Sequence, residues 1–243
     1  MKLARRHSWN LSPRDAIRLQ ARLAGSLRTG VREVCPIKME RIRLIAGADV
    51  SYSKKTNTCY AAVTVFRFPD MAIVEERTSA RRAVFPYIPG LLSFRESAPL
   101  IAAFSHLKCE PDLLVFDAQG IAHPRRFGLA SHMGYLYNKP SIGCAKSRLI
   151  GDFVQPGLSA GDWSYLRIGE EIVGCALRSK TNCKPIYISP GHLMDVDWAR
   201  HFITHCLGRY RLPEITRRPH CLSNELRLRH EKDGRKGIKR INP

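Results

Sequence analysis

The stretch DLLVFDAQG, residues 112–120, constrains the fold of the chain more than any other segment. Its four apolar residues, LLVF at 113–116, have the length and composition of a strand that is buried on both faces. Asp117 follows at once, and the next nine residues include Gly120, His123 and two arginines. A buried strand therefore ends in a carboxylate at the start of a basic loop. Because an isolated carboxylate beside an apolar core is costly, Asp117 needs a partner.

The remaining pattern predicts one α/β domain over residues 1–230. Ser12, Pro13 and Asp15 indicate a helix start, and Leu19 and Leu23 give that helix one apolar face. A tight turn at residues 69–70 predicts an antiparallel hairpin. The expected strands cover residues 41–51, 60–68, 71–78, 112–116, 140–145, 164–168, 171–178 and 185–188, and the further helices cover residues 91–106, 127–137, 195–210 and 216–229.

The charge of the chain restricts its partners. A formal net charge of +19 favours a polyanion, and nucleic acid is the simplest one, although a solvated basic surface is the alternative. No apolar run approaches the roughly 20 residues of a membrane span, and no hydrophobic segment follows the basic N-terminus. We therefore expect a cytoplasmic protein that does not bind membranes. Residues 231–243 are basic with little apolar content, and we expect a disordered tail there.

Three carboxylates occur in apolar surroundings: Asp49 in LIAGADVSY, Glu96 in LLSFRESAP, and Asp117. If the strand that carries Asp49 lies beside residues 112–116, Asp49 and Asp117 adjoin and repel each other. A divalent cation between them would remove the repulsion, and oxygen ligands suit magnesium or manganese. The alternative is that each acid pairs with one of the many arginines. The residue types alone leave this choice open.

Six separate motifs indicate a relationship. They are GADVSY, FPYIPGLLSFRE, DAQGIAHPRRFGLASH, KPSIGCAKSRLIG, KPIYISPGH and RLPEITRRPH. Through them the chain resembles the endonuclease V family from about residue 45 to residue 229, and the segment SPRDAIRLQARLA resembles its bacterial branch. The resemblance implies an α/β, ribonuclease-H-like mixed sheet flanked by helices. It also implies a Mg²⁺-dependent deoxyribonuclease, with Mn²⁺ able to substitute. Such an enzyme nicks DNA at the second phosphodiester bond 3′ to deoxyinosine, leaving a 3′-hydroxyl and a 5′-phosphate, in the repair of deaminated adenine.

The motifs assign roles to single residues. Asp49, Glu96 and Asp117 match the metal-binding carboxylates of the family, and His220 matches a histidine near the metal. Lys146, in CAKSRL, matches a lysine close to the scissile phosphate, a task that suits a compact ammonium charge. The resemblance thus implies that all five residues are catalytic, and that all except Lys146 bind metal.

The motifs also imply a lesion pocket. Tyr87, in the stiff loop PYIPG, matches a wedge that fills the gap left by a flipped base. Gly90 and Leu92 match positions that line the inosine pocket, and Gly120 and His123 match positions near the lesion. The expected lesion-binding residues are Tyr87, Ile88, Pro89, Gly90, Leu92, Ala118, Gly120 and His123.

One position departs from the family pattern. The family reads Asp-Gly-x-Gly where this chain has Asp117-Ala118-Gln119-Gly120. We expect the extra methyl group of Ala118 to crowd the pocket and to resist a positive φ angle, affecting inosine discrimination and leaving catalysis intact.

Two other functions compete with the leading one. One is an endoribonuclease that acts on inosine in RNA, since no residue here reveals a 2′-hydroxyl contact. The other is a catalytically silent nucleic-acid-binding protein, which the presence of all three acids disfavours. We expect a monomer.

Overall fold

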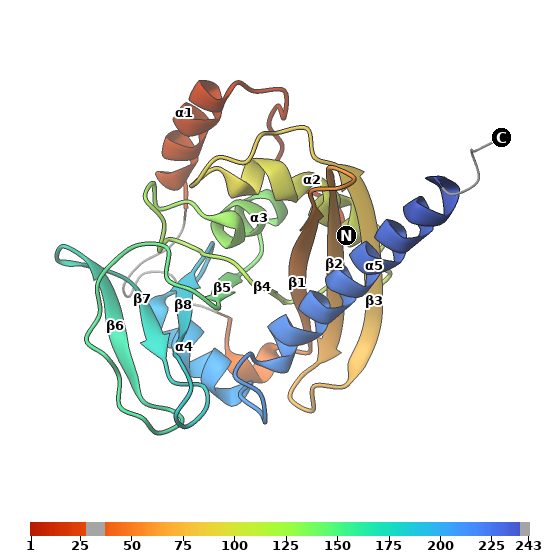
Figure 1. Ribbon diagram of the computed structural model, residues 1–243. Helices are drawn as coiled ribbons and strands as arrows, with labels where there is room; N and C mark the ends of the chain where they lie inside the picture. The colour runs from red at the N-terminus through yellow and green to blue at the C-terminus, as the bar shows by residue number, and fades with distance from the viewer. Residues whose placement is uncertain (28–36, 239–243) are drawn as a thin grey trace.

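The computed structural model describes residues 1–27 and 37–238 (Figure 1). Eight strands form one mixed sheet in the order β3-β2-β1-β4-β5-β8-β7-β6. The strands are β1 (Leu44–Ser53), β2 (Thr58–Arg67), β3 (Ile73–Arg82), β4 (Leu113–Phe116), β5 (Ser141–Ala145), β6 (Trp163–Ile168), β7 (Glu171–Leu177) and β8 (Ile186–Pro190). The α-helices are α1 (Pro13–Ala24), α2 (Leu92–Ser105), α3 (Leu129–Tyr137), α4 (Val196–His205) and α5 (Glu214–Ile238).

The sheet combines two kinds of pairing. β1, β2 and β3 are antiparallel neighbours, which confirms the predicted hairpin between the second and third strands. β4 lies parallel to β1 on its other side, and β5 lies parallel to β4. All four residues of β4 are buried, as their apolar run predicts. The mixed α/β sheet flanked by helices that we expected is therefore present.

Helices cover both faces of the sheet (Figure 1). One apolar core joins α2 and α3 to the inner strands through residues such as Leu100, Met133 and Phe116. The other core lies on the opposite face, where Phe202 of α4 and Ile215 of α5 pack against Val115 and its neighbours. Burial of these side chains is the main source of stability for a sheet of this size. Among the described residues, no helix is long and apolar enough to cross a membrane.

The ends of two helices differ from the prediction. Helix α1 begins as predicted, with the Ser12 hydroxyl accepting a hydrogen bond from the Asp15 backbone. Helix α4 ends at His205, five residues before the predicted end at residue 210. Helix α5 continues to Ile238, beyond the predicted end at residue 229 and into the segment from residue 231 that we expected to be a disordered tail. This segment has few apolar residues but several good helix formers, Lys, Arg and Glu, which extend a helix that tertiary contacts have already started. Residues 239–243 lie outside the described range.

Helix α5 lies unusually close to β1. A β-carbon on Gly47 would stand 1.7 Å from the carbonyl oxygen of Ile215, so only a glycine allows this approach. Further along β1, Asp49 and Ser51 face the same helix, because alternate residues of a strand share a face. The Ser51 hydroxyl donates to Asn224 at 3.0 Å and accepts from Arg227 at 2.8 Å. These contacts fix α5 across β1.

Candidate active site

Two of the predicted acids lie side by side because their strands are neighbours. Ala48 of β1 pairs with Phe116 of β4, so Asp49 and Asp117 are the next residues on parallel strands. The backbone N–H of Asp117 donates to the carbonyl of Ala48 at 3.1 Å, which holds the two positions together. The adjacency that we predicted from the sequence is confirmed.

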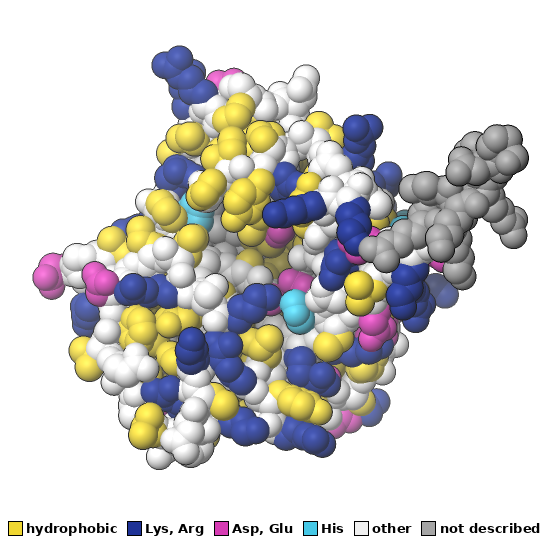
Figure 2. All heavy atoms as spheres, in the orientation of Figure 1, with side chains coloured by type: hydrophobic (Ala, Val, Ile, Leu, Met, Phe, Trp, Pro, Cys, Tyr) yellow, Lys and Arg dark blue, Asp and Glu magenta, His cyan; other side chains and the backbone are white. Residues whose placement is uncertain are grey.

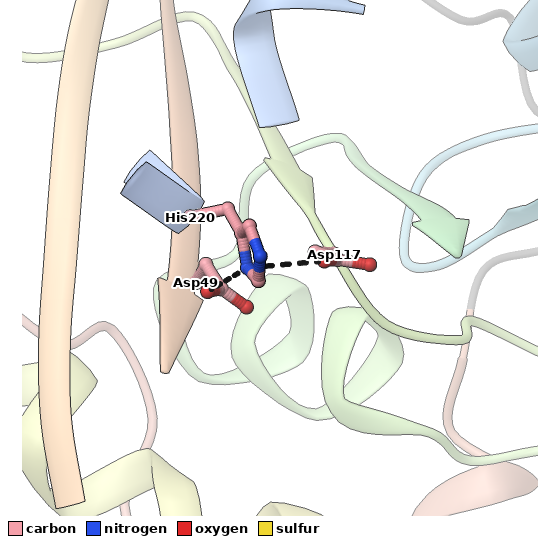
Figure 3. A group of neighbouring side chains, drawn as sticks. All are labelled: Asp49, Asp117 and His220. Carbon is pink, nitrogen blue, oxygen red and sulfur yellow. Dashed lines mark hydrogen bonds and ion pairs between the residues drawn. The ribbon is translucent and has the colours of Figure 1, made fainter. Parts of the chain in front are cut away.

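His220 reaches the two acids from helix α5. Its Nδ1 lies 3.0 Å from Asp49 Oδ2 and 3.9 Å from Asp117 Oδ2. Figure 3 shows the imidazole between the two carboxylates. One ligand atom from each of the three side chains lies within 4.8 Å of the others, a spacing that could hold one metal ion. Carboxylate oxygens suit Mg²⁺ or Mn²⁺, and a neutral imidazole is a common further ligand.

Glu96 of helix α2 brings a third carboxyl group close to Asp49 and Asp117. It is not part of the three-residue group found among the described residues. Burial, and then repulsion by Asp49 and Asp117, raises the pKa of Glu96 well above its usual value. Burial and the charge of Asp49 likewise raise the pKa of Asp117. A divalent cation would stabilise the ionised form of these three clustered acids, because they have too little neutralising charge around them.

Lys146 stands at the outer side of this cluster. It follows β5, and its Nζ lies 3.2 Å from Asp117 Oδ2. The Lys146 side chain is half-exposed, whereas that of Asp117 is 2% exposed, so the ammonium group lies between the acid and solvent. An ammonium in this position can contact a phosphate that approaches the cluster.

A pocket of about 300 Å³ opens beside the acids. Seven of the eight predicted lesion-binding residues line it: Tyr87, Ile88, Pro89, Gly90, Leu92, Ala118 and His123. Asp117 and Lys146 also line it, so the pocket and the acidic cluster share a wall. Tyr87 is 71% exposed at the rim, which leaves its ring free to contact a ligand. Gly120 is not in the lining, and its backbone N–H donates to Ser189 Oγ at 2.7 Å beneath the pocket.

His123 is a neutral group in this pocket. It is 4% exposed, and burial together with the charge of Arg125 lowers its pKa to about 4. Its imidazole also forms a hydrogen bond with the backbone of Gly90. His123 therefore connects the loop that carries Tyr87 to the loop that follows β4.

Ala118 does not have the strained backbone that we expected. Its φ angle is not among the positive ones in the described residues, so the conformation does not require glycine. Its backbone N–H donates to the carbonyl of Phe116 at 2.7 Å. Ala118 does line the pocket, so its methyl group narrows the space without straining the chain.

Ser223 is a site residue that the sequence pattern did not reveal. Its hydroxyl is completely buried and donates to Asp49 Oδ2 at 3.0 Å, the same oxygen that His220 contacts. Ser223 lies three residues after His220, on the same face of the helix. That spacing was the available signal, but only the position of α5 on β1 shows which residue it serves.

The surface around the site is positively charged. Figure 2 shows a hollow in this face with acidic side chains and a histidine at its floor and Lys and Arg side chains around it. Basic side chains around the site attract a polyanion such as nucleic acid. The acidic centre can bind a cation next to a phosphate of that polyanion. The sheet is that of a ribonuclease-H-like fold, and an acidic cluster under a basic surface on this fold points to a nuclease.

Comparison with known proteins specifies the family. The model of the endonuclease V family matches residues 26–221, and the chain belongs to this family. It is 44% identical to endonuclease V of Methanothrix thermoacetophila over 89% of this chain and 93% of that protein. It is 42% identical to endonuclease V of Dehalococcoides mccartyi over 93% of this chain and 99% of that protein.

Solved structures agree in fold. Endonuclease V of Streptomyces avermitilis has 35% identity and a TM-score of 0.84, and covers 92% of this chain and 96% of its own. Endonuclease V of Bacillus subtilis has 28% identity and a TM-score of 0.89, with 96% of this chain and all of its own covered. The Ciona intestinalis enzyme, solved with DNA containing an inosine followed by a ribo-adenosine, has 25% identity and a TM-score of 0.76; the match covers 88% of this chain and 98% of that one.

Proposed function

We propose that the chain is a divalent-metal-dependent endonuclease that nicks DNA at the second phosphodiester bond 3′ to deoxyinosine. The observation that carries this proposal is the wall shared by the pocket and the acidic cluster, formed by Asp117 and Lys146. A base held in the pocket brings its own strand to the acids. The complex of the Ciona relative with inosine-containing DNA supports the same class of substrate. The products would carry a 3′-hydroxyl and a 5′-phosphate, and the role would be repair of deaminated adenine.

The side chains divide the reaction between them. Asp49, Glu96, Asp117 and His220 would hold Mg²⁺, or Mn²⁺ in its place. When bound, such an ion lowers the pKa of water and offsets negative charge at the phosphate. Ser223 holds one oxygen of Asp49 by its hydrogen bond, leaving the other oxygen for the cation.

The pocket residues would read the lesion. A flipped base would enter between Gly90, Leu92 and Ala118, and the exposed ring of Tyr87 would fill the gap in the stack. Inosine pairs weakly, so extruding it costs less than extruding a normal base, and part of the selectivity follows from that difference. His123, which is neutral, would contact the base. Lys146 would contact the phosphate. We propose that the protein acts in the cytoplasm as a monomer.

The test is nicking of matched oligonucleotides in the presence of Mg²⁺. The substrates are duplex DNA with one inosine, the same duplex without it, and single-stranded RNA with one inosine. We expect preferential cutting of the inosine DNA beyond the lesion, and loss of cutting in Asp117→Asn. Preferential cutting of the RNA would instead assign the protein to inosine-containing RNA. Binding without cutting of any substrate would show a nucleic-acid-binding protein that is catalytically silent.

A further inference from the structure

The N-terminal helix lies outside the segment that the family model matches, yet it reaches the pocket. Helix α1 covers residues 13–24, and the matched segment begins at residue 26. One polar side chain of this helix, Gln20, is 1% exposed and lines the pocket beside the PYIPG loop. A buried amide on an otherwise apolar helix face is costly unless every hydrogen bond is made.

Gln20 makes three hydrogen bonds, which use both donors and the oxygen of its amide and connect two segments that line the pocket. Its Nε2 donates to the carbonyl of Gly90 at 3.1 Å and to the carbonyl of Phe127 at 2.6 Å. Its Oε1 accepts a hydrogen bond from Nε of Arg125. Gly90 ends the PYIPG loop, and Phe127 precedes Gly128, which also lines the pocket. The distance between these segments is thus spanned by one amide group.

The carbonyl of Gly90 is the point where the loop is fixed. Besides Gln20, it accepts a hydrogen bond from Nη2 of Arg125 at 2.7 Å. Gly90 has a φ angle of +78°, and a β-carbon there would stand 2.7 Å from the same guanidinium nitrogen. The loop therefore has a conformation that other residues adopt rarely, and the side chains behind it stabilise that conformation.

We propose that Gln20 is a positioning residue that fixes the PYIPG loop and sets the preference of the pocket for a flipped inosine. This inference rests on the proposed function and deepens it. Without the amide of Gln20, the Phe127 carbonyl and Nε of Arg125 each lose a hydrogen bond. The Gly90 carbonyl then keeps only its hydrogen bonds with Arg125 and His123. The PYIPG loop and the segment of Phe127 and Gly128 can then separate, so that the position of Tyr87 and the width of the pocket are no longer fixed.

The effect should fall on the base and not on the metal. Among the described residues, the hydrogen-bond partners of Gln20 are Gly90, Phe127 and Arg125, and none of them belongs to the acidic cluster. Loss of Gln20 should therefore change recognition of the substrate while the metal requirement stays the same. A general loss of folding would change both.

Two variants and one control separate these effects. Gln20→Met keeps the length of the side chain but forms none of the three hydrogen bonds. Gln20→Glu keeps an acceptor for Arg125 but loses both donors. Ala21→Gln, on the exposed side of the same helix, places an amide where it contacts no pocket wall. Thermal melting shows whether each variant is folded.

The measured quantity is the ratio of kcat/KM for inosine DNA to kcat/KM for the undamaged duplex. We expect this ratio to fall about 10-fold in Gln20→Met and Gln20→Glu, the effect of one to two net hydrogen bonds. KM for inosine DNA should rise, the Mg²⁺ concentration for half-maximal rate should not change, and Ala21→Gln should match the wild type. A wild-type ratio in both folded Gln20 variants, or a loss that accompanies a changed Mg²⁺ requirement, would overturn the inference.

A second readout keeps this test separate from the test of the proposed function. Fluorescence of 2-aminopurine in a bound, undamaged duplex reports unstacking by the loop and needs no inosine. We expect weaker fluorescence with both Gln20 variants than with the wild type, and equal fluorescence would count against the role of Gln20. A wild-type protein that shows no preference for inosine would refute the proposed function, and the fluorescence comparison would still decide on Gln20.

Discussion

Replacement of Gly47 by Ala should displace the helix that carries His220. The added β-carbon would stand 1.7 Å from the carbonyl oxygen of Ile215, whereas ordinary contacts begin at 3.4 Å. One side must therefore withdraw by roughly the difference, about 1.7 Å. β1 is paired along its length with β2 and also with β4, so helix α5 is the part that moves.

The displacement acts on the acidic cluster through a short stretch of helix. His220 lies five residues after Ile215, and its Nδ1 is 3.0 Å from Asp49 Oδ2 in the native arrangement. A shift of this size breaks that contact. A misplacement of about 1 Å can reduce a rate by about 10²-fold, and overpacking of a core costs about 1–3 kcal/mol. We expect both effects in Gly47→Ala.

The assay is single-turnover nicking at several Mn²⁺ concentrations, together with denaturant unfolding. Gly208→Ala is the matched control, because a β-carbon there meets no atom within 4 Å. It should keep full activity and be unchanged or up to about 1 kcal/mol more stable. If Gly47→Ala nicks at the wild-type rate with wild-type metal affinity, the close approach of Ile215 to β1 does not set the position of His220.

Three further predictions concern single side chains. Asp117→Asn should abolish nicking. It should also raise the melting temperature of the metal-free protein, because a buried carboxylate with a raised pKa destabilises the fold when it is ionised. Differential scanning fluorimetry with and without Mg²⁺ should show stabilisation by the metal only in the wild type. Ser223→Ala should weaken metal binding about 10-fold or more, measured by Mn²⁺ titration, since Asp49 loses a donor, and unchanged affinity would exclude this role. His123 has a folded-state pKa of about 4 against an ordinary 6.5, so the unfolded chain takes up the proton first as pH falls. Stability should therefore be lost between about pH 6.5 and 4, by up to roughly 3 kcal/mol, and the unfolding free energy of His123→Asn should depend less on pH there.

The sequence predicts the order of elements and the position of the acids well, for physical reasons. The apolar run before Asp117 has the length of a buried strand, and its parallel pairing with the strand of Asp49 brings the two acids together. The roles of Lys146 and His220 came from the family motifs, because a single Lys or His in a sequence carries no such information. The pocket lining around Tyr87 was also implied by motif, and its shape needed the structure.

Contacts between distant segments were not predictable. Gln20 and Gly90 are 70 residues apart, and no local pattern connects a helical amide to a loop carbonyl. Ser223 is similar, because its partner Asp49 lies 174 residues earlier in the sequence. The strain expected at Ala118 was wrong, since a loop can follow the same path with ordinary backbone angles. The end of α5 was misplaced because composition alone does not show where tertiary contacts stop supporting a helix.

The wall shared by the pocket and the acids fixes a distance along the nucleic acid. Asp117 faces the acidic cluster and Ala118, the next residue, faces the pocket. Behind them β5 packs so closely that a β-carbon on Gly143 would stand 2.5 Å from the carbonyl of Ala118. This segment therefore cannot lengthen or shift without disturbing the sheet. In the proposed reaction the pocket and the acidic cluster therefore keep a constant separation, and this separation would limit which bond beyond the bound base can be cut.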